Sequence, residues 1–399
     1  MTESQVTVAS PLIHPMRYMR TRPFAEDAVR AYMRSCGRGM PTSNLVEIIG
    51  DLVISAFNLA IEKVPREKRP QRAMAMVTQE GSLAVHVGRY SAFGRNIYVM
   101  SPNLLAMLDH TDLDSVRVSD IRLPFDAFHI SFADNFDGSL PGPPNRIDGA
   151  YVSRSGPDRL EIVVTSRRLD AKPSDSRRWP FSRDLYYYAP LDTSDGERTF
   201  ADILDRAIGT EIKIAADVVE ADPDMSVDLL NGDAIRVHDV RHLTAAEQAA
   251  YNSEGLPAFR RALALLVNGL CYMTAEPQDT QVRLPDDAPA NLVADISKGT
   301  RGQRDRAKAQ LLQRGFSFLH IIGGAMSRPT RQDGMGAGSE VLPHWRRGHW
   351  RRQPHGPARA EVRLVWIKPT LVRADRGDPQ HGHLYQVDGG RTAGDSGAT

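Results

Sequence analysis

Apolar residues recur at helical spacing in several segments of the chain. Between Leu45 and Lys63 they follow an i, i+3, i+4 pattern, which predicts a helix with one face turned to a core. Pro257–Met273 is the strongest helix candidate because its apolar surface is broad. Shorter helices are predicted at five other places: Pro23–Ser35, Pro102–Asp109, Thr199–Gly209, Thr244–Asn252 and Arg301–Gln313.

Other segments alternate apolar and polar residues between glycine- and proline-rich turns, a pattern that predicts strands of an antiparallel sheet. These strand candidates are Ser82–Gly88, Arg95–Met100, Phe125–Phe132, Ile147–Arg154, Leu160–Ser166, Asp184–Ala189 and Phe316–Ile322. The prolines within Gln278–Asn291 favour a connecting loop there.

The length of 399 residues allows two or three domains, and the pattern predicts an α+β protein. Residues 1–195 are expected to form an N-terminal α+β domain of helices and a mainly antiparallel sheet. Residues 196–322 are expected to be a mostly helical region that contains a helix pair. Residues 323–340 read as a flexible glycine-rich loop, and residues 341–388 as a basic Trp/Arg hairpin packed on the rest.

Charge and cysteine content narrow the functional classes. With 50 basic and 49 acidic residues, the chain is not a uniformly basic protein of the kind that coats nucleic acids. A near-neutral net charge still allows a local basic patch. Two cysteines cannot build a disulfide scaffold and fit a reducing compartment. The chain also has no apolar run of membrane-spanning length and begins without a signal-peptide pattern, so a cytoplasmic location is expected, with no membrane partner.

The most distinctive chemistry lies in the C-terminal hairpin, where cationic and indole side chains alternate and three of the four tryptophans occur. Arginine forks bind phosphate or carboxylate, and tryptophan stacks on bases or cations. We therefore predict a nucleic-acid or peptide-binding surface made by His344, Trp345, Arg346, Arg347, His349, Trp350, Arg351, Arg352, Arg359, Arg363, Trp366 and Lys368. The alternative is an edge hairpin whose arginines discourage strand pairing while its tryptophans pack inward.

Motifs for metals, cofactors and catalysis are weak throughout. The C-terminal histidines have no neighbouring cysteine or carboxylate at a recognised metal spacing, so they read as surface residues. The glycine-rich loop lacks the Gly-Lys-Ser/Thr ending of a phosphate loop. Carboxylates between Asp217 and Asp228 are interpreted as solvated charge. No metal, cofactor or catalytic residue is assigned.

The stretch VLPHWRRGHWRRQPHGPARAEVRLVWIKPTLV resembles a C-terminal signature of the large type V-A anti-CRISPR family of phages and other mobile elements. The preceding blocks NGLCYMTAEP and FSFLHIIGG fit the same pattern, and DIRLPFDAFHISF is a fainter match. The resemblance is most specific over residues 260–387.

The resemblance implies an interaction protein more than a conventional enzyme. The studied member of that family lowers production of the type V-A effector nuclease. It recognises the effector's N-terminal segment during synthesis, and the encoding messenger RNA is lost. The implied partners are therefore a nascent effector chain, its mRNA or the ribosome, within a bacterial host cell. The basic, aromatic C-terminal region would be the candidate contact surface.

Two other functions remain open at this stage. One is an RNA-cleaving or RNA-modifying enzyme that uses His344 or His349 as a base beside phosphate-binding arginines. The other is a structural or regulatory phage protein whose hairpin mediates assembly. The sequence leaves the oligomeric state undetermined.

Overall fold

A computed structural model describes most of the chain and confirms the predicted α+β class. The residues it describes are 13–22, 24–36, 45–62, 73–133, 135–140, 144–169, 186–208, 226–228, 234–236, 255–284, 287–326 and 344–372. Among these residues, no helix combines the length and the hydropathy needed to cross a membrane.

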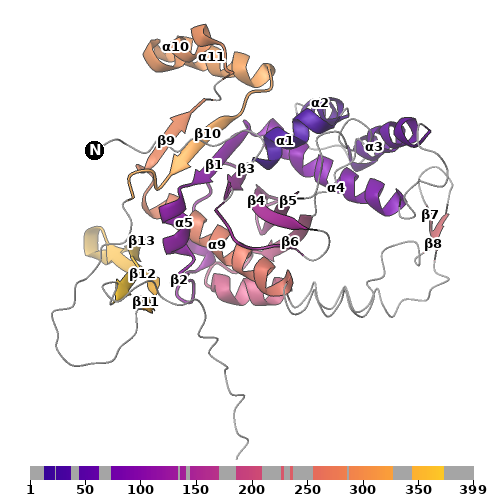
Figure 1. Cartoon of the computed structure of the whole chain (residues 1–399). Helices are drawn as coiled ribbons and strands as arrows, with labels where there is room; N and C mark the ends of the chain where they lie inside the picture. The colour runs from indigo at the N-terminus through magenta and orange to yellow at the C-terminus, as the bar shows by residue number, and fades with distance from the viewer. Residues whose placement is uncertain are drawn as a thin grey trace, which may run out of the picture.

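A seven-stranded sheet of order β6-β5-β4-β3-β1-β10-β9 forms the centre of the protein (Figure 1). Strand β1 runs parallel to both neighbours, β3 and β10, while the remaining pairs are antiparallel. The mainly antiparallel sheet predicted from the sequence is thus confirmed. The strands are β1 Asn96–Met100, β3 Ala127–Ser131, β4 Asn145–Arg154, β5 Arg159–Arg168, β6 Tyr186–Asp192, β9 Thr280–Arg283 and β10 Phe318–Ile322.

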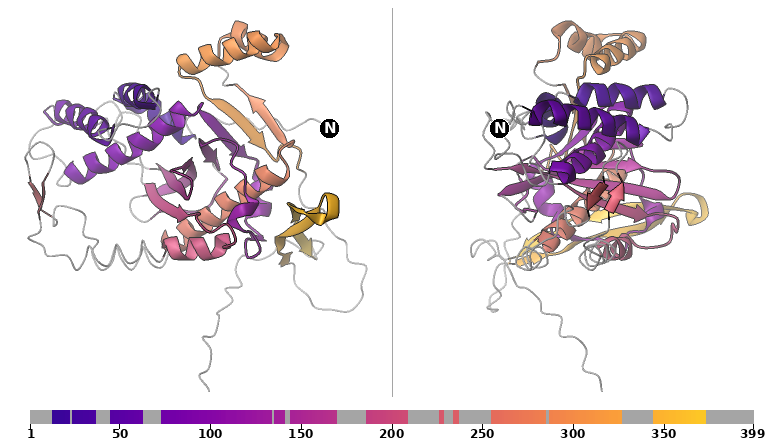
Figure 2. Two further views of the ribbon diagram at one scale, coloured as in Figure 1. Left: turned by 180° about the vertical axis from the view of Figure 1, so that it is seen from behind. Right: turned by 90° about the vertical axis from the view of Figure 1, so that its right-hand side faces the viewer.

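Four N-terminal helices cover one face of this sheet (Figures 1 and 2). Because successive strand residues point to opposite faces, Ile97 and Val99 of β1 pack toward this layer together with Leu319 and Ile321 of β10. The helices contribute their own apolar faces, including Val53. The helices are α1 His14–Thr21, α2 Ala25–Cys36, α3 Leu45–Ile61 and α4 Ala73–Ala92.

Polar side chains are buried in the middle of this helix-covered face. The Nδ1 atom of His14 lies 3.0 Å from the Tyr151 hydroxyl, and the His129 ring meets Tyr151 edge-on. Neither ring nitrogen of His129 has a hydrogen-bond partner among the described residues. Beside them, Arg17 donates to the buried Asp148 carboxylate at 2.7 Å. Polar and charged side chains that water would hydrate in the unfolded chain are therefore buried in this face of the sheet.

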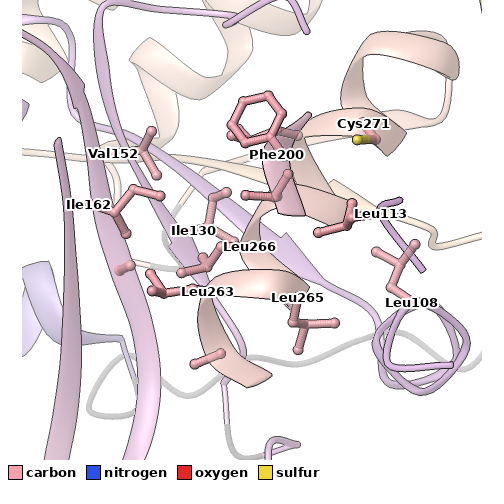
Figure 3. Packing of buried hydrophobic residues seen from close by; sticks show 14 of the residues in the cluster. Leu108, Leu113, Ile130, Val152, Ile162, Phe200, Leu263, Leu265, Leu266 and Cys271 are labelled. Carbon is pink, nitrogen blue, oxygen red and sulfur yellow. The ribbon is translucent and has the colours of Figure 1, made fainter. Parts of the chain in front are cut away.

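The long helix α9 (Leu256–Ala275) covers the opposite face of the sheet, with α5 (Pro102–Leu108) beside it. Figure 3 shows Leu263 and Leu266 among strand residues such as Ile130 and Ile162. Cys271 is buried in this core, and burial raises the pKa of its thiol well above the usual range. The helix predicted most strongly from the sequence, α9, thus packs on the sheet to form the second hydrophobic core.

Smaller elements extend this body. The C-terminal hairpin consists of β12 (Gly348–His355) and β13 (Glu361–Ile367), and β2 (Thr111–Asp112) adds to β12 in parallel. The other short elements are β11 His344–Arg346, β14 Thr370–Val372, β7 Ser226–Asp228, β8 Ala234–Arg236, α10 Ala290–Lys298, α11 Arg301–Gln313 and the 3-10 helices η3 Val118–Asp120 and η6 Pro357–Arg359.

Two predictions about local structure are wrong. Ser82–Gly88 is part of α4, because Leu83, Val87 and Tyr90 also satisfy helical spacing and are buried on one face of that helix. The predicted loop Gln278–Asn291 contains β9 and the start of α10. The predicted helix Thr244–Asn252 lies outside the described residues, as do residues 327–340 of the glycine-rich loop.

Candidate functional site: the C-terminal hairpin

The two strands of the hairpin place their side chains on two faces. Directly opposed residues of an antiparallel pair point the same way, so the pairing Trp350↔Trp366 fixes which residues share a face. The inner face consists of Trp350, Arg352, Leu364 and Trp366. The outer face consists of His349, Arg351, Gln353, Arg363, Val365 and Ile367.

The indoles of the inner face pack against α9. Trp350 is only 1% exposed and stacks on Trp366 at a centroid distance of 5.8 Å. Its Nε1–H donates to the side-chain oxygen of Asn268 at 2.7 Å, while Trp366 Nε1–H donates to Thr111 Oγ1 at 3.3 Å. Tyr272 meets Trp366 edge-on. The hairpin is therefore fastened to the body by buried aromatic area and by satisfied indole donors.

This geometry corrects part of the predicted binding surface. Trp350 and Trp366 are core residues in this structure, so their rings are not accessible for stacking on a base. Both tryptophans pack inward, as in the alternative interpretation of the sequence, an edge hairpin with buried tryptophans. Trp345 is half-buried and stacks on His110 at 4.6 Å. Any binding surface on the hairpin must therefore be made by the predicted residues other than Trp350 and Trp366.

Arg352 also has a structural partner. Its Nε–H donates to the carboxylate of Asp120 at 2.9–3.0 Å, and Asp120 is almost fully enclosed. The other carboxylate contact of Asp120 comes from the backbone N–H of Arg117 at the start of η3. This partly buried ion pair ties the inner face of the hairpin to η3, and removing Arg352 would leave the enclosed carboxylate of Asp120 without its cation.

The outer face is cationic and partly apolar. His349, Arg351 and Arg363 are exposed there, while Val365 and Ile367 are half-buried between them. Arg351 donates to the Gln353 side chain at 3.3 Å. Four more predicted residues are exposed nearby: Arg346, Arg347, Arg359 and Lys368. The backbone of His344 pairs with Val372, but its side chain is not among those that the structure describes.

The sequence did not indicate one acidic neighbour of this face. Asp112 of β2 pairs with His349, so the two side chains share a face of the small sheet. Burial, followed by repulsion from Asp114, raises the pKa of Asp112, whereas the charges of His349 and Arg347 act to lower it. Asp112 lies far from the hairpin in sequence, so only the fold brings these groups together.

Comparison with known proteins identifies the chain. A family model described as the anti-CRISPR type V subtype A2 family matches residues 98–374, which is more than half of the sequence. The chain belongs to this anti-CRISPR family. The predicted membership of a type V-A anti-CRISPR family is thereby confirmed. A search of curated proteins found no match.

A solved structure, titled the crystal structure of AcrVA2, is similar over 92% of this chain and 100% of that chain. The identity is 12% and the TM-score is 0.38.

The span matched to the anti-CRISPR type V subtype A2 family runs from β1 to the end of β14. It therefore includes the hairpin, α9 and the residues that hold them together, and it leaves α1–α4 outside. Asn268 and Asp120, which contact the inner face, were missed from the sequence. An amide within the otherwise apolar surface of α9 was the available signal for Asn268, since a buried polar group needs a partner.

In the part of this anti-CRISPR protein that the structure describes, no group of three or more His, Cys, Asp and Glu side chains is placed to hold a metal ion. Of the C-terminal histidines, His381 and His383 lie outside the described residues. What the hairpin offers chemically is charge and contact area on its outer face.

Proposed function

We propose that this anti-CRISPR protein lowers production of a type V-A effector nuclease by recognising the effector's N-terminal peptide during synthesis, with loss of the encoding mRNA. The outer face of the hairpin is the proposed contact. Family membership supports the anti-CRISPR role. The observation that carries the proposed surface is the exposure of Arg351, Arg363 and His349 around two half-buried aliphatic side chains.

A peptide suits this surface better than a bare phosphate chain. Guanidinium groups form paired hydrogen bonds with carboxylates, which gives geometric selectivity for acidic side chains. Val365 and Ile367 provide apolar area between the charges, which phosphates do not need but peptide side chains use. The face lies on a hairpin fixed by its indoles, so little ordering is required on binding.

Replacing Arg347, Arg351 and Arg363 together with alanine is expected to abolish inhibition while preserving the fold. The three side chains are exposed, and each lost contact is worth about 1 kcal/mol, so binding should weaken roughly 100-fold. The measurement is the level of effector protein and effector mRNA in cells that produce each variant.

The matched control changes three exposed arginines elsewhere: Arg30, Arg154 and Arg260 to alanine. It removes the same charge, so it should inhibit like the wild type. Full inhibition by the hairpin variant would rule out this surface, and equal loss in both variants would point to net charge alone.

An RNA-cleaving enzyme is the second candidate, because His349 lies beside Asp112 and among arginines on one face. Under the proposed binding role, His349→Ala should leave inhibition within about threefold, since one imidazole is a small part of the contact. Under the enzymatic role, loss of a general base should reduce RNA turnover by roughly 100-fold or more. Cleavage of labelled RNA by the purified proteins separates the two outcomes.

A further inference from the structure

The helix pair α10–α11 forms an arm beyond the β10–β9 side of the sheet. Figures 1 and 2 show it apart from α9 and from the hairpin. A small separate core holds the arm together, formed by Leu292, Ala307, Leu311 and Phe318. At the start of α11, Thr300 and Gln303 form a reciprocal capping box. The arm is therefore an ordered element with its own packing.

Basic residues dominate this arm in a chain that is almost neutral overall. Residues 298–314 contain one acidic residue, Asp305, and six basic ones: Lys298, Arg301, Arg304, Arg306, Lys308 and Arg314. Arg301, Arg304 and Lys308 follow one another at i, i+3 and i+7, so they share one side of α11. All three are exposed, and none forms an ion pair with another described residue.

These charges do not stabilise the helix that carries them. Cations favour the C-terminal end of a helix, where the backbone dipole is negative, but Arg301 and Arg304 occupy its beginning. The first turn contains no acidic residue to compensate. The helix dipole therefore gives no reason for arginine at these two positions.

The residue types on the exposed side of α11 indicate which class of macromolecule it could bind. Protein interfaces rely on a buried apolar or aromatic centre, yet the exposed positions of α11 up to Gln310 are occupied by Gly302, Ala309, glutamines and charged residues, with no large apolar side chain among them. Binding to single-stranded nucleic acid uses aromatic side chains for base stacking, and α11 has none. A double helix needs only cations that neutralise its phosphates.

We propose that the Arg301–Arg304–Lys308 side of α11 binds the phosphate backbone of an RNA double helix, without reading its sequence. These three residues extend over about 10 Å along the helix axis, enough to meet several phosphates of one strand. Figure 1 shows the arm above β9 and β10 and the C-terminal hairpin below them, so the two basic regions are separate surfaces. The choice of RNA over DNA rests on the proposed function, which acts at effector production; the phosphate contact rests on the arm alone.

The test compares two full-length variants in which three cations become glutamine, a good helix former. The arm variant carries Arg301→Gln, Arg304→Gln and Lys308→Gln. The control variant carries Arg30→Gln, Arg154→Gln and Arg260→Gln, so its net charge changes equally. Fluorescence anisotropy would measure binding to a labelled RNA duplex of about two helical turns at several salt concentrations.

The arm variant should bind the RNA duplex at least about tenfold more weakly, and the slope of log affinity against log salt should fall by about three. The control variant should retain wild-type binding and slope. Equal weakening in both variants, or none in the arm variant, would overturn the proposal.

Other probes test whether the partner is an RNA double helix. A DNA duplex or single-stranded RNA bound as tightly as the RNA duplex would overturn the assignment to an RNA helix, and a polyglutamate peptide bound more tightly would assign the arm to an acidic protein. The alanine variant of Arg347, Arg351 and Arg363 separates this proposal from the hairpin function. It should lose inhibition yet keep its affinity for the RNA duplex.

Discussion

Replacing Trp350 with alanine is expected to reduce the free energy of unfolding by about 3–5 kcal/mol, the range for large aromatic residues in a well-packed core. The indole is enclosed between α9 and the stacked ring of Trp366. Its loss also leaves the side-chain oxygen of Asn268 without its donor in a buried position. Urea unfolding of the purified protein, followed by tryptophan fluorescence and circular dichroism, measures this change.

Two companion variants make the result interpretable. Trp350→Phe keeps most of the ring area but removes the donor, so a smaller loss of about 1–3 kcal/mol is expected. Arg351→Ala, its exposed neighbour on the outer face, should change stability by no more than about 0.5 kcal/mol. If Trp350→Ala were as mild as Arg351→Ala, the inner face would not fasten the hairpin to α9.

Acidification is expected to destabilise the protein between pH 6.5 and about pH 4, before most carboxylates are protonated. Burial lowers the pKa of His129 to about 3, and burial followed by the charge of Arg17 lowers that of His14 well below its usual range. The unfolded chain then binds protons that the folded chain excludes, so stability present above pH 6.5 is lost as the pH falls. For His129 alone the loss at pH 5 is about 2 kcal/mol.

Both positive and negative side chains surround these imidazoles. The charged and titratable side chains in their surroundings are Arg17, Arg22, Asp148, Tyr18, Tyr151 and Glu80. Arg17 is the charge that opposes protonation of both rings. His129 has no hydrogen bond to lose among the described residues, so it can be replaced without breaking one.

The measurement is the unfolding free energy as a function of pH for the wild type and His129→Phe. The variant should show a shallower decline, by up to one proton, or about 1.4 kcal/mol per pH unit. An unchanged slope in His129→Phe would mean that this ring accepts a proton in the folded state.

Alternation and capping predicted much of the fold correctly. Leu160–Ser166 reads as a strand because its residues alternate between the two cores. The helix predicted at Pro102–Asp109 is α5, where the Ser101 side chain accepts the backbone N–H of Leu104. Ser82–Gly88 failed because its alternating residues also fit a helical face, and burial decides between the two periods. β9 was missed because the prolines that follow it dominate the local pattern.

The position of the candidate site was predictable, but its orientation was not. The density of Trp and Arg marked the hairpin from sequence alone. Which residues face the body depends on its pairing with β2 and on the amide of Asn268, both contributed by distant segments. Trp350 and Arg351 are adjacent in sequence, yet one is in the core and the other is in solvent. Sequence reasoning therefore found the hairpin and assigned too many of its residues to binding.

The parallel pairing of β1 with β10 has a consequence for how this protein is made. The Ser101 hydroxyl at the end of β1 donates to Gly323, 222 residues further along the chain. The centre of the sheet is therefore incomplete until the ribosome has released the chain beyond β10, and the open edge of β1 needs protection meanwhile. Such distant contacts fold slowly. This anti-CRISPR protein thus depends on synthesis of its chain beyond β10, and a message cut short before Ile322 is expected to yield no complete sheet.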